Sequence, residues 1–189
     1  KPRKKVRGFY LHGVTPLFVA GWWLDFKDYF FSVYQNSINQ LIGFTAIFMT
    51  YVLGRHLITN YKASQNRKQI PLVIGGWGTR GKSGTERLKA AIFNGMGSEV
   101  FSKTTGCNAM FVHADPNGKL QEYNLYRPYD KATIWEQTHA LKIAKTRGVD
   151  VFLWECMGLN PSYVTILQRW MQDDISTITN CYPDHEDTL

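Results

Sequence analysis

Residues 76–83 read GWGTRGKS, and this stretch decides the fold. It fits the pattern G-x-x-x-x-G-K-[S/T], in which glycines let the backbone wrap around phosphate oxygens without a Cβ clash. The apolar run before it, residues 70–75 (IPLVIG), predicts a buried strand. Residues 82–94 follow with a helical spacing that puts Leu88 and Ile92 on one face. A strand, a glycine-rich loop and a helix in this order predict a phosphate-binding loop rather than a chance turn.

The polar residues of this loop indicate what it binds. Its amides and the N-terminus of the following helix favour an anion. Lys82 places a point charge on the β- and γ-phosphates of a nucleotide, and the Ser83 hydroxyl is a suitable Mg²⁺ ligand. Such a site needs a second metal ligand, which normally stands at the end of a neighbouring strand.

Polar residues follow two further apolar strands. Glu155 comes directly after residues 151–154 (VFLW), and His185 comes shortly after residues 175–179 (ISTIT). The carboxyl ends of parallel strands meet at one edge of a sheet, so Ser83, Glu155 and His185 are expected to lie there together. Taken singly, Glu155 is equally well interpreted as a solvated loop acid, and His185 as a surface histidine.

The remaining pattern alternates strands and helices. It predicts an α/β fold with a mostly parallel sheet, flanking helices and right-handed crossovers. The further elements expected are strands at 99–102, 151–154 and 175–179, helices at 133–147 and 161–171, and a turn-rich hairpin or loop at 114–129.

Four motifs in a fixed order carry a family resemblance. They are residues 78–83 (GTRGKS), 103–106 (KTTG), 155–161 (ECMGLNP) and 180–187 (NCYPDHED). Together they resemble the central ATP-binding domain of the Mur ligase superfamily, and within it the poly-γ-glutamate synthase ligase subunit (CapB/PgsB type). The ECM…NP element and the arginine of the loop are specific to that branch. The resemblance covers about residues 70–189.

The resemblance implies ATP-dependent amide ligation. A carboxylate takes the γ-phosphoryl group to become an acyl phosphate, and an amine then attacks and releases phosphate. In the resembled branch the carboxylate is the γ-carboxyl of a glutamate and the amine belongs to another glutamate. ATP and Mg²⁺ are the implied cofactors, and glutamate or a glutamyl polymer is the implied substrate. The metals would neutralise charge as an anionic carboxylate approaches an anionic phosphate.

Site roles follow from the resemblance position by position. Lys82 and the amides of residues 78–83 hold the phosphates. Ser83 and Glu155 bind the Mg²⁺ that bridges the β- and γ-phosphates, and His185 ligates a second Mg²⁺. The implied catalytic residues are therefore Lys82, Glu155 and His185, and the implied nucleotide-binding residues are Gly78, Thr79, Arg80, Gly81, Lys82 and Ser83.

The resemblance also implies residues on the substrate side. Thr104 and Thr105 match a segment that lines the acceptor side, and Asn180 and Asp184 would shape the loop that presents His185. Two alternatives stay open for Arg80, since it either adds a charge on the substrate side or forms a salt bridge within the loop.

Two features depart from the resembled pattern. Gly84 stands where the branch usually has threonine, so the start of the helix is expected to differ slightly. The sequence ends at Leu189, just after the histidine motif. We therefore expect an incomplete ATP-binding domain at residues 69–189, with the remainder either on a longer polypeptide or on a separate chain.

The basic charge is confined to the first part of the chain. The formal net charge is +7, yet residues 1–68 carry 10 Lys and Arg against Asp25 and Asp28, while residues 69–189 carry 12 against 13 acids. A basic excess confined in this way does not favour a nucleic-acid partner. The three cysteines do not support a disulfide scaffold.

Two uncharged stretches lie in the basic part. Residues 8–24 and 29–54 carry no formal charge and are separated by a charged patch at residues 25–28. With basic outer flanks, they predict that residues 1–68 form a membrane-associated helical hairpin with both ends in the cytoplasm, and that this part ends in a polar linker, residues 61–69. The alternatives are a single membrane helix after an interfacial segment, or buried helices of a soluble domain.

The leading hypothesis is a membrane-anchored amide ligase that makes γ-linked glutamate polymer. Its expected partners are membrane lipid and, by resemblance, small membrane subunits. One alternative is another Mur-superfamily ligase with a different acceptor. A second is a nucleotide-binding regulatory or transport subunit, which would need no acyl-phosphate metal site at Glu155 and His185.

Overall fold

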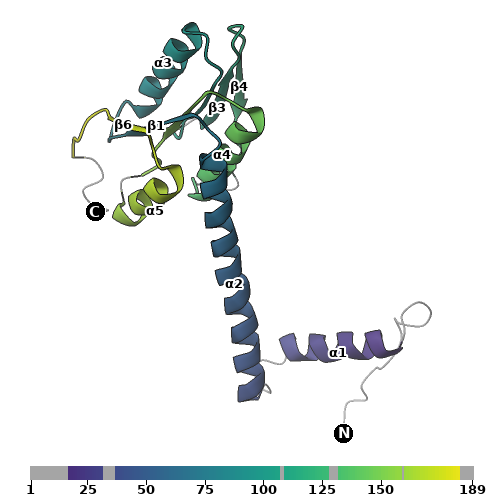
Figure 1. Ribbon diagram of the computed structural model, residues 1–189. Helices are drawn as coiled ribbons and strands as arrows, with labels where there is room; N and C mark the ends of the chain where they lie inside the picture. The colour runs from purple at the N-terminus through teal and green to yellow at the C-terminus, as the bar shows by residue number, and fades with distance from the viewer. Residues whose placement is uncertain (1–16, 32–36, 107–108, 128–131, 159, 184–189) are drawn as a thin grey trace. The chain divides into compact units, whose positions relative to one another are not determined.

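The computed structural model describes residues 17–31, 37–106, 109–127, 132–158 and 160–183 (Figure 1). The chain forms two compact units, the first ending at Gly54 and the second beginning at Arg55. The elements are α1 (Leu17–Phe31), α2 (Ile38–Arg67), β1 (Leu72–Trp77), α3 (Lys82–Gly95), β2 (Val100–Lys103), β3 (Met110–Ala114), β4 (Leu120–Asn124), α4 (Trp135–Arg147), β5 (Val151–Glu155), α5 (Pro161–Met171) and β6 (Ile175–Ile178).

The second unit contains a six-stranded sheet with the order β4-β3-β2-β5-β1-β6. The strands β2, β5, β1 and β6 run parallel, and β3 and β4 form an antiparallel hairpin at one side. The predicted mixed α/β architecture is confirmed, and the segment at 114–129 contributes the turn and second strand of this hairpin. The first strand begins at Leu72 and reaches Trp77, so it starts and ends two residues later than predicted.

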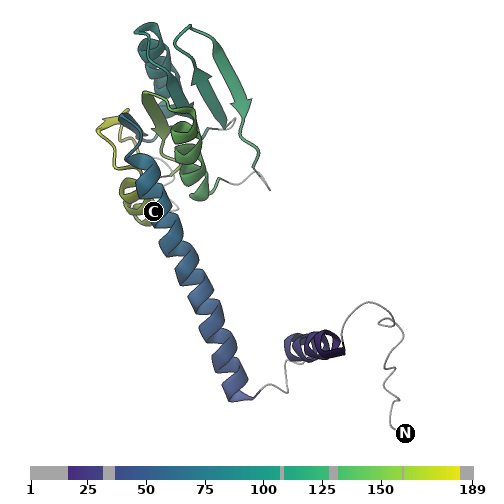
Figure 2. The same cartoon turned by 45° about the vertical axis from the view of Figure 1, so that its right-hand side comes forward.

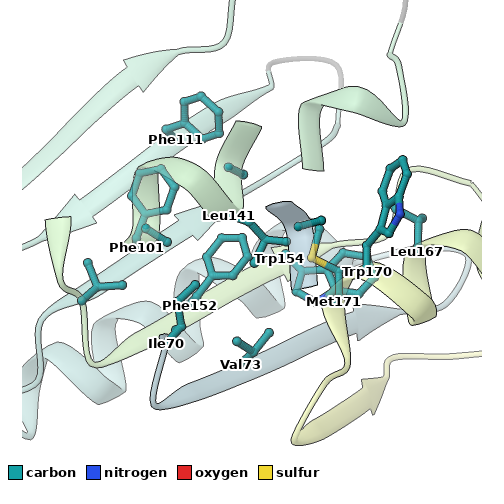
Figure 3. Close-up of a cluster of buried hydrophobic side chains, with 14 of the residues drawn as sticks. Ile70, Val73, Phe101, Phe111, Leu141, Phe152, Trp154, Leu167, Trp170 and Met171 are labelled. Atoms are coloured by element: carbon teal, nitrogen blue, oxygen red, sulfur yellow. The ribbon is translucent and has the colours of Figure 1, made fainter. Parts of the chain in front are cut away.

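Helices cover both faces of the sheet (Figure 1 and Figure 2). Successive side chains of a strand point to opposite faces. Val73 of β1 therefore joins a core with α4 and α5, whereas Ile74 joins a smaller core with α3. Figure 3 shows the larger core, in which the Phe101 ring stacks on those of Phe111 and Phe152.

The first unit contains α1 and the first part of α2, and their arrangement as a membrane hairpin stays a prediction. The charged patch at residues 25–28 lies inside α1 and does not separate it from α2. The patch contains no glycine or proline to end a helix, and its side chains are exposed, so the charges stay in solvent without breaking the helix.

Among the described residues, α2 is the one helix long and apolar enough to cross a membrane. None of its most apolar window is buried within the structure, which argues against a core helix of a soluble domain. Large apolar side chains of this helix, such as Ile42, Ile47 and Leu53, are exposed. Exposed apolar residues on a helix of this length are typical of membrane association.

The predicted linker at residues 61–69 is largely helical, because α2 continues to Arg67. Its last turns belong to the second unit, where Ala63 joins the larger core. The buried Arg67 guanidinium donates to the carbonyls of Met171 (2.6 Å) and Gln172 (2.8 Å) and pairs with Asp174 at 2.7 Å. These tertiary contacts stabilise a helical end that its polar composition does not indicate. The division of the chain at residue 68 stays a prediction.

Candidate functional site

The glycine-rich loop, residues 78–81, connects β1 to α3. Gly78 and Gly81 have φ angles of 117° and 79°, a region that L side chains rarely adopt. At Gly78 there is also no space for a side chain. A Cβ there would lie 2.3 Å from Thr179 Oγ1 and 2.8 Å from the Asn180 carbonyl oxygen. The loop can follow this path only because glycine occupies position 78.

Two residues after β6, Thr179 and Asn180, form hydrogen bonds with the glycine-rich loop. The Asn180 side chain accepts hydrogen bonds from Thr79 Oγ1 and from the Arg80 amide, and its Nδ2 donates to the Arg80 carbonyl at 2.9 Å. Thr179 Oγ1 donates to the same carbonyl at 2.8 Å. The structure thus places Asn180 as a brace on the loop, a contact that the sequence did not indicate. The Arg80 side chain is exposed. Asp184 and His185 lie outside the described residues, so the second metal ligand stays a prediction.

Lys82 is the first residue of α3, and its side chain bends back over the loop. Its Nζ donates to the carbonyls of Gly78 (2.6 Å) and Thr79 (3.2 Å). The ammonium group therefore lies at the mouth of the loop, beside the amides at the helix N-terminus. This arrangement concentrates positive charge where an anion would bind.

The end of β5 and the segments that follow β1 and β2 bring one carboxylate and two hydrogen-bond donors together. Glu155 ends β5 opposite Gly76 of β1 and is buried. Its Oε2 accepts from Ser83 Oγ at 2.8 Å and from the Thr105 amide at 2.7 Å. The structure therefore brings Ser83 and Glu155 together, as the ends of their strands predicted, and adds Thr105, for which the resemblance implied a place on the acceptor side. Thr104 is buried, and its hydroxyl accepts from the Met110 amide. Its place on the acceptor side stays a prediction.

The donor set suits Mg²⁺ better than a thiolate-bound metal. Mg²⁺ is usually held by one or two carboxylates together with phosphate oxygens and water. A hydroxyl and a carboxylate in contact beside the glycine-rich loop fit that pattern. In the described part of the chain, no group of three or more His, Cys, Asp or Glu side chains could hold a metal by itself. Burial raises the pKa of the Cys156 thiol, which disfavours a thiolate ligand next to Glu155.

A buried charged cluster behind Thr105 was missed by sequence reasoning. It consists of Lys103, Arg127 and Glu136. Lys103 Nζ lies 3.1 Å from Glu136 Oε2, and Arg127 donates to both carboxylate oxygens of Glu136 at 2.9 and 3.0 Å. Burial lowers the pKa of Lys103 to about 8, so its ammonium is still charged at neutral pH. Burial raises the pKa of Glu136, but Arg127 and Lys103 outweigh it and lower the pKa overall.

A second buried carboxylate lies behind the loop. Glu86 of α3 is completely buried, and a Cβ at Gly76 would meet its Oε1 at 2.0 Å. Lys89 pairs with it at 2.6 Å. Burial raises the pKa of Glu86 from 4.5 to about 7, although the Lys89 contact acts in the opposite direction. No sequence pattern distinguishes this glutamate from a solvent-exposed helix residue.

We expect the protein to lose stability as the pH rises from 4.5 to about 7. In this window the folded state keeps the Glu86 proton that the unfolded chain has released, so the free energy of unfolding falls with pH. A shift of this size corresponds to about 3 kcal/mol. Glu86→Gln is expected to flatten this dependence in urea unfolding measured across the window, whereas the exposed control Glu122→Gln keeps it. Identical slopes for wild type and Glu86→Gln would contradict the assignment.

In comparisons with known proteins, this chain is similar to two CapB proteins. It is 29% identical over 134 residues to the PGA synthase CapB of Bacillus subtilis (strain 168), covering 70% of this chain and 33% of that protein. It is 28% identical over 151 residues to the capsule biosynthesis protein CapB of Bacillus anthracis, covering 79% of this chain and 31% of that protein. The chain thus spans about a third of the length of these relatives. No family model matches the sequence.

Proposed function

We propose that this chain carries the Mg²⁺- and ATP-binding part of a ligase that joins glutamates in poly-γ-glutamate synthesis. The observation that carries the proposal is the contact of Ser83 with Glu155 beside the glycine-rich loop and Lys82. The similarity to two CapB proteins, one of which is a PGA synthase, supports the substrate class. The ligation step is ATP-dependent and passes through an acyl phosphate.

Each residue of the site has a defined task in this proposal. The loop amides and Lys82 bind the β- and γ-phosphates, whose oxygens replace the loop carbonyls as acceptors for the ammonium group. Ser83 and Glu155 supply oxygen ligands to the cation, which when bound neutralises charge on the phosphates. Gly78 and Asn180 keep the loop amides in place before the nucleotide arrives, so little ordering is required on binding.

Membrane attachment belongs to the same proposal. The α2 helix spans the bilayer, with the nucleotide-binding unit on the cytoplasmic side, where ATP is available. Small membrane subunits would then contact the lipid-embedded part of the chain. The alternative of a nucleotide-dependent switch is less favoured, because similarity to a synthase predicts chemical turnover.

We expect glutamate to stimulate ADP release by the full-length protein in its membrane fraction. The γ-phosphoryl group is transferred productively only when a carboxylate acceptor is bound, so ADP should form several-fold faster with glutamate than without it. The measurement is ADP release from Mg²⁺ and ATP, with and without glutamate. Lys82→Ala serves as the inactive control. Equal ADP release with and without glutamate would contradict the ligase proposal. If Lys82→Ala released no ADP in that case, a nucleotide-dependent switch would be favoured.

A further inference from the structure

The Glu155 carboxylate is hydrogen-bonded on one side. Both donors that reach it, Ser83 Oγ and the Thr105 amide, bind Oε2. Among the described residues, no hydrogen bond reaches Oε1. An amide at a fixed position therefore determines which carboxylate oxygen is left for another partner. The orientation of a ligating carboxylate depends on outer hydrogen bonds of this kind.

The peptide group at position 105 is itself held by a charged side chain. Its amide bonds Glu155, and its carbonyl accepts a hydrogen bond from Arg127 Nη1 at 3.3 Å. The other guanidinium nitrogens of Arg127 form a two-pronged pair with Glu136, a geometry that restricts the guanidinium to one plane. The chain of contacts thus runs from Glu136 through Arg127 and Thr105 to Glu155.

Glu136 is in turn fixed by its own surroundings. It lies in the first turn of α4, where the helix dipole favours a carboxylate, and its Oε1 also accepts from the Thr133 amide. Lys103, which is fully buried, pairs with its Oε2. A carboxylate held by two cations and an amide has little freedom to move. The cluster carries one excess positive charge, which compensates the buried negative charge of Glu155.

We infer that Arg127 and Glu136 are positioning residues, which hold the Thr105 amide on Glu155 Oε2 and so direct Oε1 of Glu155 toward the cation of the nucleotide site. This inference rests on the proposed function, because it assumes that Glu155 is a metal ligand. It extends that function by assigning a role to two residues outside all four sequence motifs. A purely structural role would require only that the buried charges neutralise one another.

The test measures the cation separately from turnover. The whole chain in detergent is titrated with Mn²⁺ in the presence of a non-hydrolysable ATP analogue, and binding is followed by electron paramagnetic resonance. Loss of an outer-shell partner typically weakens metal affinity 10- to 100-fold, and we expect a loss of about tenfold for Arg127→Gln. Nucleotide affinity measured without metal should stay close to wild type. Hydrogen exchange at the Thr105 amide should become faster in the same variant.

Two further variants keep the test decisive. Glu136→Gln retains the shape of the side chain but weakens its pairing with Arg127, so it should also lower Mn²⁺ affinity. It provides the test in case Arg127→Gln does not fold. Arg147→Gln is the matched control, because Arg147 lies over the rings of Phe101 and Tyr123 at 5.8 and 5.3 Å and does not contact Thr105 or Glu155. Its Mn²⁺ affinity should equal that of wild type.

The outcomes separate the inference from the proposed function. Folded Arg127→Gln and Glu136→Gln proteins with wild-type Mn²⁺ affinity and wild-type exchange at Thr105 would overturn the inference alone. If these variants lost nucleotide affinity without metal as strongly as they lost Mn²⁺ affinity, the two residues would have a structural role, and the inference would also be overturned. A wild-type protein that binds neither nucleotide nor Mn²⁺ would overturn the proposed function, and the inference with it.

Discussion

Replacing Glu155 with glutamine should nearly abolish Mg²⁺-dependent ATP turnover while the fold stays intact. Glu155 is 3% exposed, and its carboxylate is hydrogen-bonded to Ser83 and Thr105, so an isosteric amide fits the space. The variant loses the negative charge that the proposed cation site requires. It also offers an NH₂ group to partners that donate hydrogen bonds themselves. Loss of the metal's electrostatic contribution corresponds to several kcal/mol, or on the order of a thousandfold in rate.

The experiment compares phosphate release by full-length wild type, Glu155→Gln and Glu122→Gln. Glu122 is an exposed residue of β4 in the antiparallel hairpin, so its substitution changes the charge equally without touching the site. Thermal unfolding of each variant verifies that the fold persists. Turnover by Glu155→Gln at the Glu122→Gln rate would exclude Glu155 as a metal ligand.

Gly78→Ala should remove nucleotide binding and destabilise the protein. Its φ of 117° is strained for any residue with a Cβ, at a cost of about 1–3 kcal/mol. Thr179 can rotate away from the new Cβ, but the Asn180 carbonyl, 2.8 Å from it, is backbone. The loop or the segment after β6 must then move. Adding this overlap brings the expected loss to about 2–5 kcal/mol.

A second glycine, Gly118, separates the effect of backbone strain from that of steric overlap. Gly118 has a φ of 80°, and no atom lies within 4 Å of the position that a Cβ would take there, so Gly118→Ala introduces backbone strain without overlap. We expect it to lose about 1 kcal/mol and keep wild-type nucleotide affinity. Urea unfolding and binding of an ATP analogue measure both properties. Equal effects at the two glycines would mean that the contact with Asn180 is unimportant.

The sequence predicted the features that depend on local pattern. The strand, glycine-rich loop and helix at residues 70–94 need particular residue types at fixed spacing, so they were recognisable. The meeting of Ser83 with Glu155 followed from a general property of parallel sheets, which place the ends of their strands at one edge. Neither prediction requires the exact order of the strands in the sheet.

What the sequence did not predict depends on distant pairs. Arg127 and Glu136 lie in segments without a recognisable motif, and only the folded sheet brings them behind Thr105. Glu86 reads as an ordinary helix residue until Gly76 is seen to leave space for it. The helical end of α2 needs Met171 and Gln172 as acceptors for Arg67. The local sequence does not indicate which distant residues will become such partners.

The Asn180 brace has a consequence for the order of events during synthesis. The glycine-rich loop is bonded to a residue 101 positions further along the chain. A ribosome that has translated only the strand, the loop and the helix has produced the motif without the residues that hold its shape. Closing such a long segment is entropically costly and slow compared with forming a helix. The glycine-rich loop of the nascent chain therefore gains these stabilising hydrogen bonds late, after β6 and Asn180 have emerged.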